Sequence, residues 1–121
     1  LARLLEPLSP AGVDVFHVST RRFWEPAFSG SPRSLAAWTR HITGKPVIAV
    51  GGLGLDEVPG PGLPADSPSL EHMKTGLVRG DFDFFAAGRA LLADRDLGDK
   101  LRRERFEAIT RFDERHLATL D

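Results

Sequence analysis

Two glycine-containing segments, each directly after an apolar run, have the residue types best suited to binding an anion. Gly51 and Gly52 follow one run, and Gly88 and Arg89 follow the next run along the chain. Glycine lets backbone N–H groups approach an anion because no Cβ is in the way. Arginine can bind two phosphate oxygens at once. A glycine pair after a strand more often forms only a tight turn, but two such segments on consecutive strands predict a phosphate-binding site.

Three apolar runs are the strands that must position these residues. They are Val13–Ser19, Pro46–Val50 and Phe82–Ala87, and each precedes a loop rich in Gly, Pro or Ser and then a helical stretch. Apolar residues on both faces are typical of buried parallel strands, which predicts an α/β fold. The runs start at positions 13, 46 and 82, that is, 33 and then 36 residues apart. A (β/α)8 barrel averages roughly 31 residues per unit, although doubly wound sheets repeat similarly.

Helix signals fall between the predicted strands. Ser34 is placed to cap a helix that Gly44 ends, and Ser69 to cap a helix that Gly80 ends. The predicted helices cover residues 1–8, 35–42, 70–79, 90–92 and about 99–120. The whole chain, 1–121, is therefore predicted to be a single partial domain, with βα units over 12–98 and a C-terminal helix over 99–121. Three such units cannot close a barrel alone, so we expect missing chain on the N-terminal side or, as the alternative, a second copy.

The overall composition excludes several classes of function. With 16 basic and 17 acidic residues the net charge is −1, so nothing indicates a nucleic acid or an anionic membrane as partner. The absence of cysteine excludes disulfides and thiolate chemistry. No apolar run approaches the roughly 20 residues that cross a bilayer. The chain starts without methionine and without a signal peptide, so we expect a cytoplasmic and incomplete protein.

Three stretches together resemble one family, the old yellow enzymes or NADH:flavin oxidoreductases. They are Val15–Ser19, Gly44–Gly52 and Phe82–Asp94, and the resemblance extends from Gly12 to about Arg102. It implies that the chain is the C-terminal portion of a (β/α)8 TIM barrel, with the three runs as strands 6–8. It also implies FMN as cofactor and NAD(P)H as reductant, with an activated alkene as substrate. The residues implied to hold the FMN phosphate are Gly51, Gly52, Leu53, Gly88 and Arg89.

The chemistry of that family cannot be completed by these residues. Its proton-donating tyrosine and substrate-binding histidine pair lie on earlier strands; this chain has no tyrosine, and its four histidines are scattered singly. Arg95 also stands where the family usually has proline, which affects local rigidity only. We therefore predict no catalytic residue here, and only the FMN-binding portion of a flavin-dependent oxidoreductase. The alternatives are another phosphate-binding (β/α)8 enzyme of the aldolase or isomerase type, or a non-catalytic truncated fragment.

Several other features allow two interpretations each. His17 is interpreted as a hydrogen-bonded core histidine, with a position facing the flavin as the alternative. The segment 21–28 either shapes a substrate or nicotinamide pocket or packs against the barrel. The segment 55–69 is either a surface insertion or a lid over the flavin. The acidic groups 56–57 and 94–99 lack the spacing of metal ligands, so we predict no metal site and expect them to be solvated.

Overall fold

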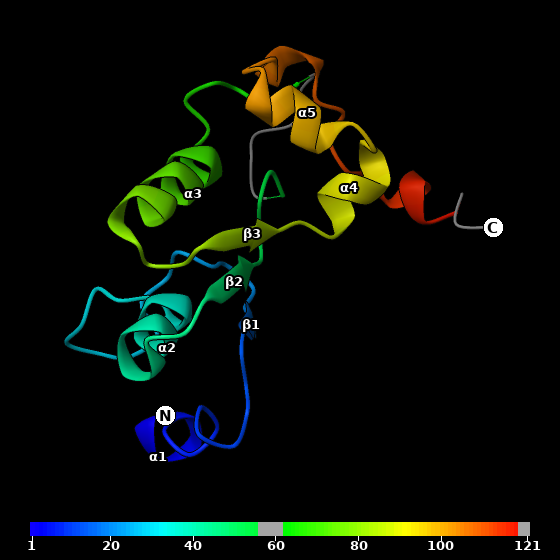
Figure 1. Cartoon of the computed structure of the whole chain (residues 1–121). Coiled ribbons are helices and arrows are strands. Elements are labelled where there is room, and N and C mark those ends of the chain that lie inside the picture. The colour runs from blue at the N-terminus through cyan, green and yellow to red at the C-terminus, as the bar shows by residue number, and fades with distance from the viewer. Residues whose placement is uncertain (56–61, 119–121) are drawn as a thin grey trace.

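The computed structural model describes residues 1–55 and 62–118, which form a mixed α/β structure (Figure 1). Its centre is a parallel sheet whose strands lie in the order β1-β2-β3. The strands are β1 (Phe16–Ser19), β2 (Val47–Val50) and β3 (Phe84–Ala86). The helices are α1 (Ala2–Leu5), α2 (Leu35–Thr43), α3 (Pro68–Arg79), α4 (Arg89–Ala93) and α5 (Leu97–Arg102), followed by the 3₁₀ turns η1 (Phe106–Ala108) and η2 (Glu114–Leu117).

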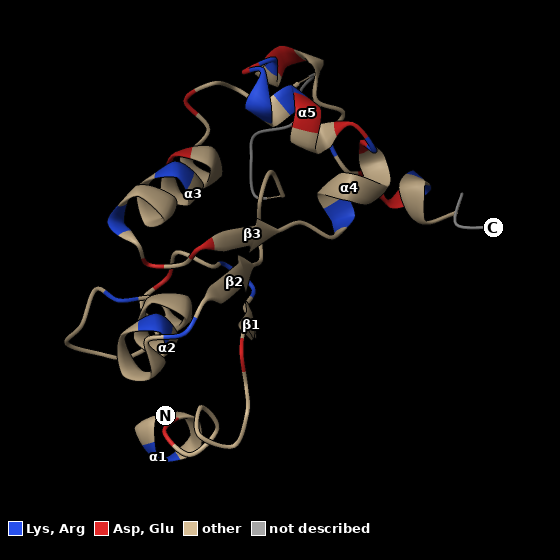
Figure 2. Cartoon of the chain, viewed as in Figure 1, with Lys and Arg blue, Asp and Glu red and all other residues tan. Residues whose placement is uncertain are grey.

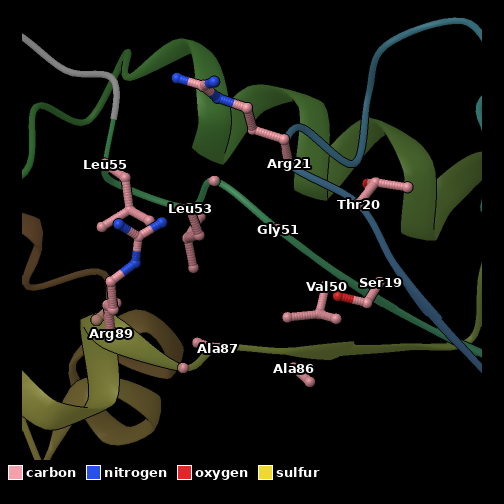
Figure 3. A pocket seen from close by; sticks show the side chains of 13 residues that line it. Ser19, Thr20, Arg21, Val50, Gly51, Leu53, Leu55, Ala86, Ala87 and Arg89 are labelled. Atoms are coloured by element: carbon pink, nitrogen blue, oxygen red, sulfur yellow. The ribbon is translucent and has the colours of Figure 1, made fainter.

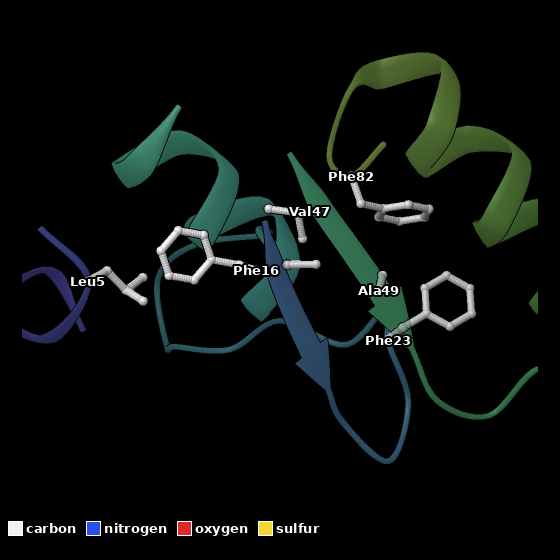
Figure 4. Packing of buried hydrophobic residues seen from close by; sticks show 7 residues of the cluster. Leu5, Phe16, Phe23, Val47, Ala49 and Phe82 are labelled. Atoms are coloured by element: carbon white, nitrogen blue, oxygen red, sulfur yellow. The ribbon is translucent and has the colours of Figure 1, made fainter. Parts of the chain in front are cut away.

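Only one face of the sheet is covered by the described helices. Val47 and Ala49 of β2 are fully buried and pack in one cluster with Phe16, Phe82 and Ala36 of α2 (Figure 4). Met73 of α3 packs against the same cluster, so α2 and α3 lie on this side. The alternate residues form the other face, which we name the open face. They are His17, Ser19, Ile48, Val50, Phe84 and Ala86, all exposed or half-buried.

The prediction of a (β/α)8 barrel portion is wrong for this structure. The described chain forms an open sheet of three strands, in which β1 and β3 are edge strands. A closed barrel has no edges and needs about eight strands at a fixed stagger. The prediction depended on the repeat length, which open α/β sheets share with barrels. The part of it that the structure does show is the alternation of parallel strands and helices.

The long C-terminal helix predicted over 99–120 is also wrong. Helix α5 ends at Arg102, and Glu104 has a left-handed backbone with φ of +55°. Beyond this break the chain forms short 3₁₀ turns, and Phe106 and Ile109 are buried in a second cluster with Leu53 and others. The N–H of Leu63 donates to the carbonyl of Phe106 at 2.9 Å. Contacts with a distant segment therefore override the helical spacing seen in the sequence.

The N-terminal cap of α2 is the predicted residue, whereas that of α3 is a different one. Ser34 Oγ accepts the N–H of Ala37 at 3.3 Å, and Gly44 ends α2 with φ of +64°, as predicted. Gly80 likewise ends α3. The cap of α3 is Ser67 rather than Ser69, because Pro68 occupies the first helical position. Ser69 instead has a role in the site described below.

Asp94 contradicts the prediction that the acidic group 94–99 is solvated. Its side chain is buried and accepts hydrogen bonds from Lys100 Nζ at 2.6 Å and the Thr110 N–H at 2.8 Å. Burial alone would raise its pKa, but these bonds together hold the pKa of Asp94 below its ordinary value. Asp94 therefore joins Lys100 of α5 to the segment after η1. The other group, 56–57, lies outside the described residues.

Charges of both signs are interspersed over the described elements (Figure 2). None of the helices in residues 1–55 and 62–118 is both long and apolar enough to cross a lipid bilayer.

Candidate anion-binding site

A cavity of about 270 Å³ lies where all three strands end (Figure 3). This strand-end cavity is formed by the segments that follow β1, β2 and β3. Its lining residues are Ser19, Thr20, Arg21, Val50, Gly51, Gly52, Leu53, Leu55, Ala86, Ala87, Gly88, Arg89 and Ala90. All five residues predicted to bind phosphate are among them. They meet because the carboxyl ends of parallel strands lie at the same edge of a sheet.

The two glycines after β2 are required by their surroundings. Gly51 has φ of +140°, and a Cβ atom there would lie 1.8 Å from the carbonyl oxygen of Thr20. Gly52 has φ of +84°, and its Cβ would lie 3.1 Å from the ring of Trp24. At Gly88, by contrast, no atom lies within 4 Å of an added Cβ. The backbone after β2 is therefore packed too closely to accept a side chain, whereas Gly88 leaves space open.

Three contacts hold the segment after β2 in place. The N–H of Phe23 donates to the carbonyl of Gly51 at 3.3 Å, which joins the segments after β1 and β2. The N–H of Gly54 donates to Ser69 Oγ at 3.0 Å, which joins this segment to α3. Trp24, which packs against Gly52, stacks on His72 of α3 at 5.2 Å between ring centroids. These contacts hold the segment after β2 against the segment after β1 and against α3.

Two arginines make the strand-end cavity positively charged. Arg89 begins α4 and Arg21 follows β1, with the segment after β2 between them (Figure 3). The described lining residues include neither Asp nor Glu. Neither arginine forms an ion pair with a carboxylate in the part of the chain that the structure describes. The guanidinium carbon of Arg89 lies 5.7 Å from the ring centroid of Phe112. Phe112 therefore restricts this guanidinium without neutralising its charge.

Hydrogen-bond donors without acceptors add to the positive character. The backbone N–H groups of Gly52, Leu53 and Arg89 donate to no acceptor within residues 1–55 and 62–118. The hydroxyl of Thr20 is buried and also lacks a partner in that part of the chain. Buried polar groups are rarely left unpaired in folded proteins. Free donors beside two cations indicate that the cavity suits an anion with several oxygens.

The segment after β1, one of the three segments that line this cavity, is not among the predicted site residues. The sequence predicts no site role for Thr20, and Arg21 enters only as part of a possible pocket at 21–28. The available signal was the same one that found Gly51 and Arg89, because Ser19–Arg21 also follow a predicted strand directly. Phe23, by contrast, is buried in the core cluster, so packing is its main role.

Two further predictions concern His17 and the segment 55–69. His17 is exposed on the open face and is not a core histidine; nor does it line the strand-end cavity. Most of the loop predicted at 55–69 as an insertion or lid lies outside the described residues at 56–61. The described remainder packs into the molecule: Leu63 is buried, and Arg111 Nε donates to the carbonyl of Gly62.

No protein-family model matches this sequence, and no curated protein matches it either. The functional assignment therefore depends on the geometry of the cavity and on the resemblance of the sequence motifs.

Proposed function

We propose that the strand-end cavity binds the phosphate group of FMN, and that this chain supplies the FMN-binding part of a flavin-dependent oxidoreductase. The observation that carries the proposal is the meeting of Gly51, Gly52, Gly88 and Arg89 around one cavity, whose described lining residues include no carboxylate. These residues come from two segments between which α3 and β3 lie in the chain. Their meeting supports a phosphate site better than either glycine segment does alone.

The donor set fits a phosphate monoester. Such a group carries between about −1.5 and −2 charges at neutral pH and has three acceptor oxygens. Arg89 and Arg21 supply the compensating charge, and the N–H groups of Gly52 and Leu53, which have no acceptor among the described residues, supply further donors. The close approach of backbone to backbone at Gly51 leaves no side chain to block this wall. A hydrogen bond to a charged group contributes roughly 1.5–3 kcal/mol.

Apolar surface adjoins the cavity on one side. Val50 and Ala86 line the cavity and also belong to the open face, where Phe84 is 58% exposed. A flavin ring joined to the bound phosphate through its ribityl chain has apolar side chains within reach there. This continuity favours a ligand with a large apolar part over inorganic phosphate alone.

In the proposed function, FMN would carry hydride from NAD(P)H to an activated alkene. This chain would bind and orient the phosphate end of the cofactor. It contains no tyrosine, so in the proposal proton donation and substrate binding come from groups outside this chain. The family assignment itself belongs to the proposal.

The test compares FMN with riboflavin, which has the same ring but no phosphate. Arg89→Gln should weaken FMN binding by about 10- to 150-fold, because it removes a charge-assisted contact of roughly 1.5–3 kcal/mol. Riboflavin affinity should stay the same. Arg95→Gln is the matched control, since Arg95 is an exposed arginine that does not line the cavity. Fluorescence titration of each flavin measures both affinities.

Two results would contradict separate parts of the proposal. If Arg89→Gln weakens FMN and riboflavin equally, Arg89 does not bind the phosphate. If FMN binds no more tightly than inorganic phosphate and the two compete, the cavity is an anion site without a flavin role.

A further inference from the structure

A second cavity of about 240 Å³ lies beside the strand-end cavity and shares two residues with it, Thr20 and Arg21. This side cavity is formed by the loop between β1 and α2 and by the start of α2. Arg22 and Glu25 also line it, and the apolar part of its wall is formed by Pro26, Ala27, Phe28 and Leu35. The side cavity therefore combines charged side chains with an apolar wall.

Backbone contacts and one ring contact hold the loop that forms the apolar wall in place. The N–H of Ala27 donates to the carbonyl of Arg33 at 3.0 Å, and Pro26 forms an antiparallel bridge with Ser34. Phe28, although 48% exposed, packs edge-on against Trp38 of α2 at 6.3 Å between ring centroids. A loop held at several points can present a preformed apolar surface to a ligand.

The charges of the side cavity leave one cation available. Glu25 also lines it, but its carboxylate pairs with Arg22 Nη1 at 3.0 Å, so this acid is compensated locally. Arg21 forms no ion pair within the described residues. An incoming carboxylate would pair with the Arg21 guanidinium.

We propose that the side cavity binds a small organic carboxylate with an apolar body. The carboxylate accepts from the Arg21 guanidinium, and the body packs on Phe28 and Leu35. The volume lies below the roughly 300–1,000 Å³ of pockets for drug-sized ligands, which favours a ligand of the size of an aromatic or short branched acid. Arg21 lines both cavities, so a carboxylate bound here would share this cation with a phosphate bound in the strand-end cavity.

The test uses benzoate as the probe and benzyl alcohol as its neutral counterpart of similar shape. Ligand-observed NMR titration of the whole chain should show benzoate binding at least about tenfold more tightly than benzyl alcohol, because only benzoate uses the cation. Arg21→Gln should remove that preference. Phe28→Ala should weaken both probes, because the apolar wall serves both. Both substitutions are at exposed side chains, and an unchanged melting temperature would establish that they fold.

Arg89→Gln is the matched control, because Arg89 lines only the strand-end cavity of the two. It should leave benzoate affinity unchanged even if it abolishes phosphate binding. The proposal is overturned if benzoate fails to bind, or if the two probes bind equally. It is also overturned if Arg89→Gln weakens benzoate as much as Arg21→Gln does, since the carboxylate would then occupy the strand-end cavity.

Discussion

The carbonyl oxygen of Thr20 lies 1.8 Å from the position that a Cβ atom on Gly51 would occupy. This contact brings the segment after β1 against the segment after β2. The N–H of Thr20 donates to the carbonyl of Val50 at 3.1 Å, directly before that glycine. The strand-end cavity depends on this close approach, because it sets the position of Arg21 relative to Gly52.

Gly51→Ala should lower the free energy of unfolding by about 2–4 kcal/mol. The added methyl cannot fit beside Thr20 without moving backbone, and φ of +140° is strained for alanine. Chemical denaturation followed by circular dichroism measures the change. Gly98→Ala is the control, because its Cβ would have no neighbour within 4 Å and it lies within α5. That variant should be unchanged or more stable by up to about 1 kcal/mol; equal stability of the two variants would disprove the close packing at Gly51.

Phe112→Leu should weaken FMN binding by about two- to fivefold. The ring of Phe112 contacts the Arg89 guanidinium at 5.7 Å, and an exposed cation–π contact contributes roughly 0.5–1 kcal/mol. Leucine keeps an apolar side chain at the site but removes the ring. In the Arg89→Gln background the same substitution should have no further effect on FMN affinity, which a double-mutant cycle tests. Additive effects would show that Phe112 acts on the fold rather than through Arg89.

The chain alone should not reduce an activated alkene at an ordinary enzymatic rate, even with excess FMN and NADPH. It contains no tyrosine to act as the family's proton donor, and loss of a general acid typically costs about 10²–10⁴-fold in rate. The measurement is NADPH oxidation in the presence of 2-cyclohexenone, without oxygen. Turnover of roughly 1 per second or more would show that another residue of this chain donates the proton.

Asp94→Asn should reduce the free energy of unfolding by about 1–3 kcal/mol at neutral pH. The buried carboxylate accepts from Lys100 Nζ and from the Thr110 N–H, and the neutral amide cannot compensate the lysine. Asp96→Asn is the matched control, because Asp96 is exposed and its side chain forms no cap hydrogen bond. Thermal or denaturant unfolding of both variants gives the comparison, and equal losses would contradict the role of Asp94.

The effect of Asp94 should also depend on pH in a defined direction. Its folded-state pKa is lowered, so the ionised carboxylate stabilises the fold fully above the unfolded-state pKa of about 3.9. That stabilisation should disappear as the pH falls further, through the lower folded-state pKa. The difference between wild type and Asp94→Asn should therefore be constant near neutral pH and shrink below about pH 4. A difference that grew in acid would have the wrong sign.

Features set by neighbouring residues could be predicted from the sequence. Ser34 and Gly44 bound α2 because a hydroxyl cap and a left-handed glycine act within one turn of a helix. Gly51, Gly52, Gly88 and Arg89 meet because each follows a strand, and parallel strands end at the same edge of the sheet. These predictions required only the local order of residue types and the direction of the strands.

Only the tertiary structure decided the features that depend on distant contacts. The repeat length could not distinguish a barrel from an open sheet, because both use βα units of similar size. The acidic neighbours of Asp94 in the sequence predict a solvated side chain. In the structure its carboxylate is buried and accepts hydrogen bonds from Lys100 and Thr110. The predicted C-terminal helix ends at Arg102, and Phe106 and Ile109 are instead buried in one cluster with Leu53. Burial is determined by which segments of the chain meet, and the free energy gained there exceeds the small propensities that govern a local stretch.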